Sequence, residues 1–408
     1  MPEPEEVKVN PTTPPPEPVK TVGPPPEPKP TPFELTVDRD AFLDELGLAA
    51  WCAEKRATQP ILSAVLLTLQ PQEKKKWLAL QTTDLEVAFA TRLPITASTG
   101  SGRVAVDAQL LLSACNAVTS DTLRLTFSGT AFTLDAGNAH FELPTFNPAN
   151  FPVLPERPGG AVALAAEPLV AAIEHTRYGV SAEPNRYTMN GALLVIGAAT
   201  NKLKMVATDG HRMPIYEHPV KIDKKAPDLQ LIVPVPMLSL LPSALADAST
   251  VALAYNEAHL FFSAGKRQMA VRRMMGQFPQ YEHVLPTDLP VRMECDRKEL
   301  VACLRRVALV ADERSNGVRL EFHPKSLVIT THSDAGSSTD KLAAATTGLT
   351  EPLMVGFDLR YLLDFVTSAR TSRVALSVKA KDLACRFDIV PEEGVDYQLL
   401  CVIMPLRY

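Results

Sequence analysis

The feature that most constrains this chain is a weak internal repeat with a period of about 120 to 125 residues. Each copy opens with a short strand and an amphipathic helix, in the segments FELTVDRDAFLDELGLAAWCAEK, AVALAAEPLVAAIEHTRYGV and VRMECDRKELVACLRRVALVAD. Apolar residues recur there at spacings of three and four, which is typical of a helix with one buried face. Each of these helices follows a strand that ends in or near Asp or Glu, which suits the first turn of a helix.

A second motif recurs further along each copy. The segments WLALQTTDLEVAF, LKMVATDGHRMPI and LVITTHSDAGSS each lead from a strand into a turn with Thr, Ser or Asp. Each is followed by strands of alternating apolar residues on either side of a helix of about ten residues. The sequence therefore predicts three copies of one α+β unit with two helices and several antiparallel strands. Proline-rich stretches at 151–160 and 278–290 mark the boundaries between the copies.

Composition sets limits on location and partners. The chain has 408 residues, of which 46% are hydrophobic, and a net charge of −5. It holds no uncharged apolar run of about 18 residues, so a membrane-spanning helix is not expected. The first residues show no apolar segment typical of a signal peptide, which favours a cytoplasmic protein. The negative charge argues against coating of nucleic acid but allows a local basic lining.

The first 32 residues have a composition of their own. They carry 13 of the 36 prolines, five Glu and three Lys, with few apolar residues. Such a segment buries too little surface to offset its ordering entropy, so residues 1–32 are expected to form a disordered, Pro-rich tail. Whether it is a spacer or a ligand for a partner stays open at this point.

Six cysteines lie at positions 52, 115, 295, 303, 385 and 401, without any C-x-x-C spacing. Most stand in apolar runs, which predicts small buried thiols in a reducing compartment. Neither a zinc site nor another metal site is expected from this spacing.

An enzyme is the main alternative from a different class. Asp209 and His211 in TDGHR, together with the THSD segment, could suggest a metal or phosphoryl-transfer site. However, no glycine-rich phosphate loop, H-E-x-x-H, G-x-S-x-G or pair of carboxylates accompanies them. The sequence therefore favours a protein without catalytic activity.

Six segments carry a family resemblance: NRYTMNGALL, ATDGHRM, FPQYEHVLP, NGVRLEF, YLLDFV and the terminal VIMPLRY. In this order and spacing, on a threefold repeat, they resemble the bacterial sliding clamp, the beta subunit of DNA polymerase III. The resemblance covers residues 34–408. It implies clamp domains at 33–155, 161–285 and 286–408. It also implies antiparallel sheets outside, helices lining a ring, and a homodimer of two chains joined head to tail.

The resemblance also implies a function. Such a ring is a processivity factor that encircles double-stranded DNA without reading its sequence. It tethers the replicative polymerase alpha subunit, the clamp loader, and repair and translesion polymerases. No cofactor is implied, because the energy for opening comes from the loader's ATP. The alternative is a divergent clamp paralogue that serves a specialised polymerase or a resistance role.

The resemblance places a partner-peptide pocket between the second and third domains. Apolar side chains there suit Leu and Phe anchors, and methionines suit a site with many partners. The family often has Arg at His283 and Leu at Met213 and Met189, and Cys385 replaces a small hydroxyl residue, so an altered peptide preference is expected. The matching positions are Met189, Thr208, Gly210, His211, Arg212, Met213, Pro279, His283, Val284, Tyr361, Cys385, Val402, Met404, Pro405, Leu406 and Arg407.

Two further sets of positions follow from the resemblance. Arg56, Tyr187 and Arg177 are expected to face DNA, within a lining of basic helices under an acidic exterior. Further cations of that lining are Lys55, Arg297, Lys298, Arg305, Arg306, Arg360 and Arg370. Ring closure is expected to bury one apolar patch against another, and in a lone subunit these residues would form a sticky surface. The two sides of that interface are Phe141 and Leu143, and Leu309 and Val310.

Overall fold

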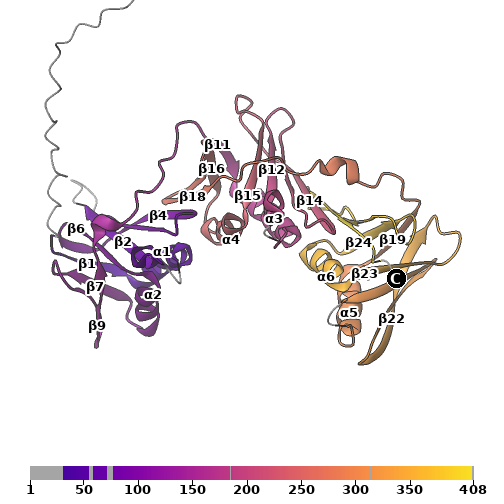
Figure 1. Cartoon of the computed structure of the whole chain (residues 1–408), viewed down its shortest axis with the longest axis horizontal. Coiled ribbons are helices and arrows are strands. Elements are labelled where there is room, and N and C mark those ends of the chain that lie inside the picture. Colours follow the sequence, from indigo (N-terminus) through magenta and orange to yellow (C-terminus); the bar gives the residue numbers. More distant parts are fainter. Residues whose placement is uncertain (1–30, 55–57, 71–76, 184, 313–314, 407–408) are drawn as a thin grey trace, which may run out of the picture.

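The computed structural model describes residues 31–54, 58–70, 77–183, 185–312 and 315–406. Three units follow one another along an arc, with the labelled helices on the concave side and strands outside them (Figure 1). The fold class is therefore α+β, as predicted. Residues 1–30 of the expected tail lie outside the described residues.

The first unit has two helices and ten strands among its described residues. Its elements are β1 (Phe33–Asp38), α1 (Arg39–Cys52), the 3-10 helix η1 (Pro60–Ser63), β2 (Ala64–Gln70), β3 (Trp77–Thr83), β4 (Val87–Pro94), β5 (Ala97–Gly100), β6 (Gly102–Asp107), α2 (Ala108–Ala117), β7 (Thr122–Phe127), β8 (Phe132–Ala136), β9 (Ala139–Leu143), β10 (Thr145–Phe146) and η2 (Pro148–Asn150).

The second unit repeats this order. Its elements are β11 (Val162–Ala165), α3 (Ala166–Thr176), η3 (Arg177–Gly179), η4 (Tyr187–Met189), β12 (Gly191–Gly197), β13 (Lys202–Val206), β14 (Arg212–Pro219), β15 (Leu229–Pro234), α4 (Val235–Ala244), β16 (Thr250–Tyr255), β17 (His259–Ala264) and β18 (Arg267–Arg272). The connection to the third unit contains η5 (Tyr281–Val284).

The third unit repeats it again. Its elements are β19 (Val291–Asp296), α5 (Arg297–Ala308), β20 (Gly317–His323), β21 (Ser326–Ser333), β22 (Gly336–Thr347), β23 (Leu353–Asp358), α6 (Leu359–Ser368), β24 (Arg373–Val378), β25 (Cys385–Ile389) and β26 (Gln398–Ile403).

The first helix of each unit starts directly after a strand. The carboxylates of Asp38 and Asp296 accept backbone hydrogen bonds from the first turns of α1 and α5, at 2.9 and 2.8 Å. In α3 the cap position is Ala165, which has no side chain to accept such a bond, and Glu167 supplies the negative charge of the first turn. All three helices therefore have the predicted acidic residue at or near their start, but in α3 no side chain caps the helix.

In the described part of the chain, no helix is long and apolar enough to cross a membrane.

Sheets run from one unit into the next. In a nine-stranded sheet, β18 of the second unit pairs with β4 of the first, and Met269 lies opposite Phe89. In a twelve-stranded sheet, β14 of the second unit pairs with β26 of the third, and Met213 lies opposite Val402. We name these junctions the first seam and the second seam. At both seams, the fourth strand of the earlier unit pairs with the last strand of the later unit.

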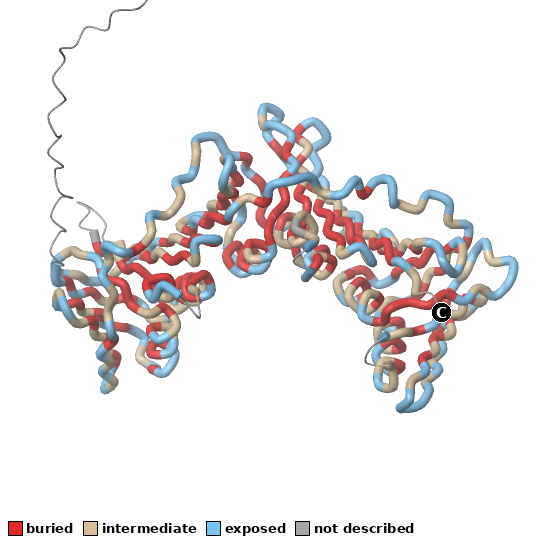
Figure 2. Tube along the Cα trace, in the orientation of Figure 1, coloured by how far each residue is buried: buried red, intermediate tan, exposed pale blue. Residues whose placement is uncertain are grey.

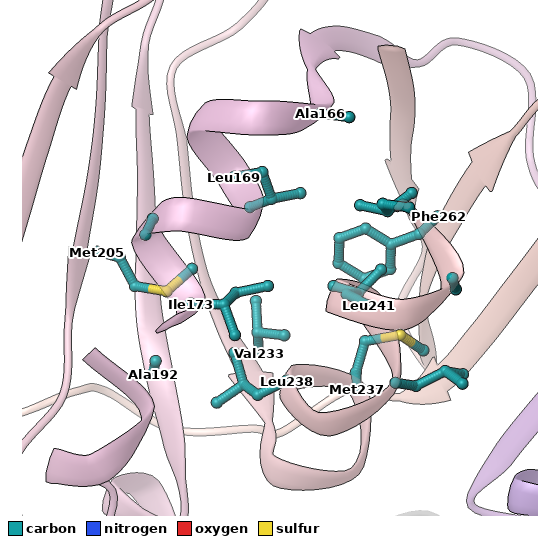
Figure 3. Close-up of a cluster of buried hydrophobic side chains, with 14 of the residues drawn as sticks. Ala166, Leu169, Ile173, Ala192, Met205, Val233, Met237, Leu238, Leu241 and Phe262 are labelled. Atoms are coloured by element: carbon teal, nitrogen blue, oxygen red, sulfur yellow. The ribbon is translucent and has the colours of Figure 1, made fainter. Parts of the chain in front are cut away.

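The core lies between helices and sheets in each unit (Figure 2). In the second unit, Leu169 and Ile173 of α3 face Leu241 of α4, with Val233 of β15 and Phe262 of β17 around them (Figure 3). All five are at most 1% exposed. Truncating such a residue to Ala typically costs about 2–5 kcal/mol, so these contacts hold each unit together.

The cysteines confirm the prediction of buried thiols. All six are free and buried. Burial raises the pKa of Cys115, Cys295, Cys385 and Cys401 to about 12, so these sulfurs stay protonated at neutral pH.

Candidate functional site

The candidate peptide site is built around the turn between β13 and β14, at the second seam. The Asp209 carboxylate accepts hydrogen bonds from the backbone N–H groups of His211 and Arg212, both at 2.9 Å. The Thr208 hydroxyl accepts one from Gly210 at 3.1 Å and donates to the Arg212 carbonyl at 2.9 Å. Gly210 has a φ of +88°, and a Cβ there would lie 2.3 Å from a guanidinium nitrogen. The turn therefore requires glycine at this position.

Arg212 links the second unit to the third. Its side chain forms ion pairs with Asp209 in its own turn, at 3.0 Å, and with Asp364 on α6. Its guanidinium carbon lies 5.2 Å from the ring centroid of Tyr178 and 4.5 Å from that of Tyr361 on α6. Burial disfavours the charge, but the two carboxylates outweigh burial and raise the pKa of Arg212. Arg212 is therefore a fixed part of the seam.

An apolar floor lies beside this turn. Met213 on β14 and Val402 on β26 are paired across the seam, and each is 4% exposed. Phe278 and Tyr281 come from the connection between the second and third units and meet edge to face, with ring centroids 6.5 Å apart. The buried residues of this cluster are Leu193, Val206, Met213, Ile215, Ile232, Met274, Tyr281 and Val402.

Three apolar side chains that are close in sequence to residues of that floor are exposed. Val284 is 59% exposed, Leu383 45% and Met404 44%. The backbone N–H of Met404 donates to the carbonyl of His211 at 2.8 Å, which holds the end of the chain against the turn. A surface with a fixed polar turn and flexible apolar side chains can accept an extended peptide with apolar anchors.

The remaining predicted positions lie around the same surface. A Cβ built onto Gly210 would lie 3.8 Å from the terminal methyl carbon of Met189, so Met189 stands next to the turn. The Cys385 thiol is buried and donates to the Leu383 carbonyl at 3.3 Å, so at this point Leu383 faces solvent and Cys385 does not. Pro279 and His283 are exposed, Pro405 and Leu406 are partly buried, and Arg407 lies outside the described residues.

The sequence did not predict Tyr178, Asp364 and Leu383 as part of this site, nor any buried residue of the apolar floor except Met213 and Val402. Asp364 stands three residues after Tyr361 in the YLLDFV helix, a spacing that puts both side chains on one helix face. This spacing could have indicated that Asp364 belongs to the same site as Tyr361. Nothing in the sequence indicates that Tyr178, just after α3, faces Arg212.

The polar side chains of this turn are engaged with one another and with neighbouring groups. The oxygens of Asp209 are bonded to backbone N–H groups and to Arg212. His211 is exposed, and its ring stacks on Tyr361 with centroids 6.4 Å apart. Over the described ranges, no group of three or more His, Cys, Asp or Glu residues could hold a metal ion.

The DNA-facing candidates are only partly described. Arg56 lies outside the described residues, as does Lys55. Tyr187 begins the short helix η4, but its side chain is not described. Arg177 begins η3 at the end of α3 and is exposed.

The helices on the concave side carry acidic as well as basic residues. In α1 and α3, Asp40, Asp44 and Glu167 are exposed, and the lining of basic helices stays a prediction. Arg297 is bound to the carbonyls of Val366 and Thr371. Three further predicted cations are paired with carboxylates: Arg306 with Asp340, Arg360 with Asp358, and Arg370 with Glu174.

The interface candidates lie at the two ends of the arc. Phe141 on β9 is partly buried, Val310 is partly buried, and Leu309 is 84% exposed. Leu143 was expected to be exposed in a lone subunit, but it is only 6% exposed, because the end of β9 faces the core of its own unit. The apolar patch of the first unit is therefore smaller than expected.

An arc of three repeated units, with sheets running across both seams and an apolar site at one of them, defines a clamp-type protein. Family models of the DNA polymerase III beta subunit match the chain in three parts: the N-terminal domain at residues 33–155, the central domain at 163–280 and the C-terminal domain at 282–407. The chain therefore belongs to the DNA polymerase III beta subunit family and is a sliding clamp.

Relatives and solved structures agree with this assignment. The chain is 29% identical to the beta sliding clamp of Pseudomonas putida over 379 residues, covering 92% of this chain and 100% of the relative. It is 28% identical to that of Caulobacter vibrioides over 388 residues, with the same coverage. A sliding clamp structure from Pseudomonas aeruginosa bound to griselimycin is similar with a TM-score of 0.84 and 27% identity, covering 92% of this chain and 100% of that chain.

Proposed function

We propose that two copies of this chain close head to tail into a ring around double-stranded DNA, without reading its sequence. The ring acts as a non-catalytic processivity factor in the cytoplasm. Its partners are the replicative polymerase alpha subunit, the clamp loader, and repair and translesion polymerases. The domain limits at 33–155, 161–285 and 286–408 are part of the same proposal.

The observation that carries this proposal is a pair of open strand edges. At the first seam Ala270 of β18 lies opposite Ala88 of β4, and at the second Val402 of β26 lies opposite Met213 of β14. At the two ends of the arc, the equivalent two strands of the repeat have an edge that no described strand of another unit pairs with. These are β9, which ends its five-stranded sheet, and the first part of β22, which pairs on one side with β21. A third seam between two chains would close both edges.

Burial supports the same closure. The repeat register places Phe141 of β9 at the position of Met269 in β18 and Cys401 in β26. Met269 is 2% exposed and lies opposite Phe89 of the first unit, and Cys401 is 0% exposed and lies opposite Pro214 of the second unit. Phe141 is only partly buried in a single chain. A partner subunit would cover it in the same way.

The second-seam surface supports the tethering role. It combines the rigid turn at Thr208–Met213 with exposed Val284, Leu383 and Met404 and a buried apolar floor. The predicted pocket residues are the proposed peptide contacts. The match to sliding clamps over nearly the whole chain does not favour a divergent paralogue.

The test is retention on DNA of different topology. The protein is incubated with a bacterial clamp loader, ATP and either closed circular or linear duplex DNA, and then separated from free protein by gel filtration. A ring held by topology stays on circles and leaves linear DNA through its ends. Equal retention or equal loss on the two substrates would contradict the proposal.

A further inference from the structure

The first seam repeats the turn that carries the candidate peptide site at the second seam. In the turn between β3 and β4, the Thr83 hydroxyl donates to the carbonyl of Val87 at 2.8 Å. The Asp84 carboxylate accepts hydrogen bonds from the backbone N–H groups of Glu86 and Val87, at 2.9 and 2.7 Å. The turn at 208–213 makes the same bonds one unit later. The strands at the two seams can therefore be compared residue by residue.

The sheet beside this turn is hollow at the first seam. Ala88 pairs with Ala270 there, in the place where Met213 pairs with Val402 at the second seam. The small side chains leave a cleft of about 720 Å³ over β3, β4, β17 and β18. The connection at residues 148–157 forms one wall of this cleft. We name it the first-seam cleft.

The first-seam cleft has aromatic rings in its lining and charged residues at its margin. The rings are those of Phe151 and Phe261. Arg103, Glu156 and Arg157 are exposed, and within the described ranges neither arginine pairs with a carboxylate. Grooves lined by aromatic rings bind proline-rich segments in the polyproline II conformation. The cleft therefore suits a proline-rich segment that carries charges of both signs.

The chain enters the fold at the edge of this cleft. The hydroxyl of Thr31 donates to the carbonyl of Ser101. A Cβ on Gly102 would lie 2.4 Å from the carbonyl oxygen of Thr31, so the two backbones are in close contact. The next residue, Arg103, lines the cleft. The Pro-rich segment that precedes Thr31 is therefore attached beside the first-seam cleft.

The dimensions of the cleft match the nearer of two repeats in that segment. The sequence reads PPPEPKP at residues 24–30, and PPPEP also occurs at 14–18. From β6 to β18 there are four steps in the nine-stranded sheet, which is about 19 Å at about 4.8 Å per step. Seven residues of polyproline II helix span about 22 Å. Residues 24–30 can therefore cross the cleft, whereas an extended 14–18 would lie beyond its far end.

We propose that residues 24–30 bind in the first-seam cleft of their own chain. Their proline rings pack against the aromatic lining, Glu27 pairs with an arginine of the margin, and Lys29 pairs with Glu156. A tethered segment has an effective concentration in the millimolar range, which favours it over a proline-rich peptide of another protein. The bound segment spans the first seam and joins the first unit to the second. This proposal does not depend on ring closure.

The test measures access to the cleft in the full-length protein. Gln268→Cys places a thiol at an exposed position of the cleft, and the native thiols are buried. Mass spectrometry follows the rate at which a maleimide modifies this thiol. Three versions of the chain are compared: the wild-type tail, one with the prolines of 24–26 changed to Ser, and one with the prolines of 14–16 changed to Ser. Lys224→Cys, at an exposed position between β14 and β15, is the control thiol.

Changing the prolines of 24–26 should raise the rate at Gln268→Cys by about fivefold or more, because the tethered segment no longer competes with the reagent. Changing those of 14–16 should leave the rate unchanged. Likewise, Glu27→Lys should raise the rate and Glu17→Lys should not. The rate at Lys224→Cys should be the same throughout, which excludes unfolding as the cause.

Three results would overturn the proposal. Equal rates at Gln268→Cys with all three tails would show that the segment does not cover the cleft. An equal rise from the change at 14–16 would show that residues 24–30 have no special place in it. Protection that weakens on dilution would assign the cleft to the tail of another copy.

Discussion

The guanidinium carbon of Arg212 lies 4.5 Å above the ring centroid of Tyr361, so a cation of the second unit stacks on an aromatic ring of the third. The ring of Tyr178 also lies against this guanidinium group, with its centroid 5.2 Å from the carbon, and the carboxylates of Asp209 and Asp364 hold its nitrogens. An arginine engaged on all these sides is not free to pair with a ligand. It fixes the angle of the second seam and forms one wall of the candidate peptide site.

The first prediction concerns this contact across the seam. Asp364→Asn removes one of the two carboxylates that balance Arg212. The expected loss of stability is about 1 kcal/mol, because Asp364 is 42% exposed and solvent screens the pair. The midpoint of urea unfolding and the affinity for a Q-L-x-L-F peptide should both fall. The control is Asp382→Asn, an exposed carboxylate in the connection between β24 and β25. Equal effects of the two substitutions would contradict the role of Arg212.

The second prediction concerns the proposed third seam. Leu309 is 84% exposed in the single chain, so Leu309→Lys should leave the folded subunit intact. In the ring it would place a charge in an apolar contact, and sedimentation should show monomers. Val153 is 95% exposed in the connection between the first two units, and Val153→Lys serves as the control. A dimer that persists in the Leu309 variant would show that this residue lies outside the interface.

The third prediction uses the register of that seam. Continuing the pairing of the two internal seams puts Glu142 of β9 opposite Ser337 of the partner subunit. Both residues are exposed, and the native thiols are buried. The Glu142→Cys, Ser337→Cys variant should form a covalent dimer on mild oxidation, seen on a non-reducing gel. Pairing Glu142→Cys with Lys341→Cys, about 13 Å further along the strand, should not. The opposite pattern would refute this register.

The fourth prediction is a pH dependence. His175 is 1% exposed and packs against the rings of Tyr216 and Tyr397, with centroids 5.3 and 5.2 Å away, and these two rings also contact each other at 5.2 Å. Burial and the nearby charge of Arg370 lower the pKa of His175 to about 4. Between pH 6.5 and 4 the unfolded chain binds a proton that the folded protein excludes, so stability falls as the pH falls, by about 3 kcal/mol.

The measurement is urea unfolding at pH 7 and pH 4.5. His175→Phe keeps an aromatic ring in the stack and removes the titrating group, so its stability should fall less over this range. Other groups titrate equally in both proteins, and the difference between them reports on His175. The same pH dependence in both proteins would exclude this cause.

Local patterns in the sequence were enough to predict the units but not their junctions. The opening helices, their acidic starts at Asp38 and Asp296, and the turn at Asp209 follow from short-range chemistry. The pairing of Arg212 with Asp364 joins residues 152 positions apart, and no local pattern indicates it. Burial of Leu143 and the ion pairs on α5 and α6 likewise depend on how the strands and helices pack.

The first seam shows the strongest example of such a long-range contact. Glu45 on α1 is fully buried and accepts hydrogen bonds from Arg267 on β18 at 2.8 Å and from Thr91 at 2.7 Å, with Lys266 at 2.9 Å. Burial disfavours its charge, but these partners outweigh burial and lower the pKa of Glu45. Asp247 also pairs with Arg267, at 2.6 Å.

The fifth prediction follows from this cluster. Glu45→Leu leaves the buried Arg267 with the exposed carboxylate of Asp247 and the carbonyl of Ala244 as its partners, and the expected loss of stability is about 3–5 kcal/mol. Adding Arg267→Met should restore most of it, because two apolar side chains can fill the place of the ion pair. Urea unfolding of both variants measures the effect, and proteolysis within residues 151–161 reports whether the first seam opens. If Glu45→Leu alone unfolds at the wild-type urea concentration, the ion pair does not hold the two units together.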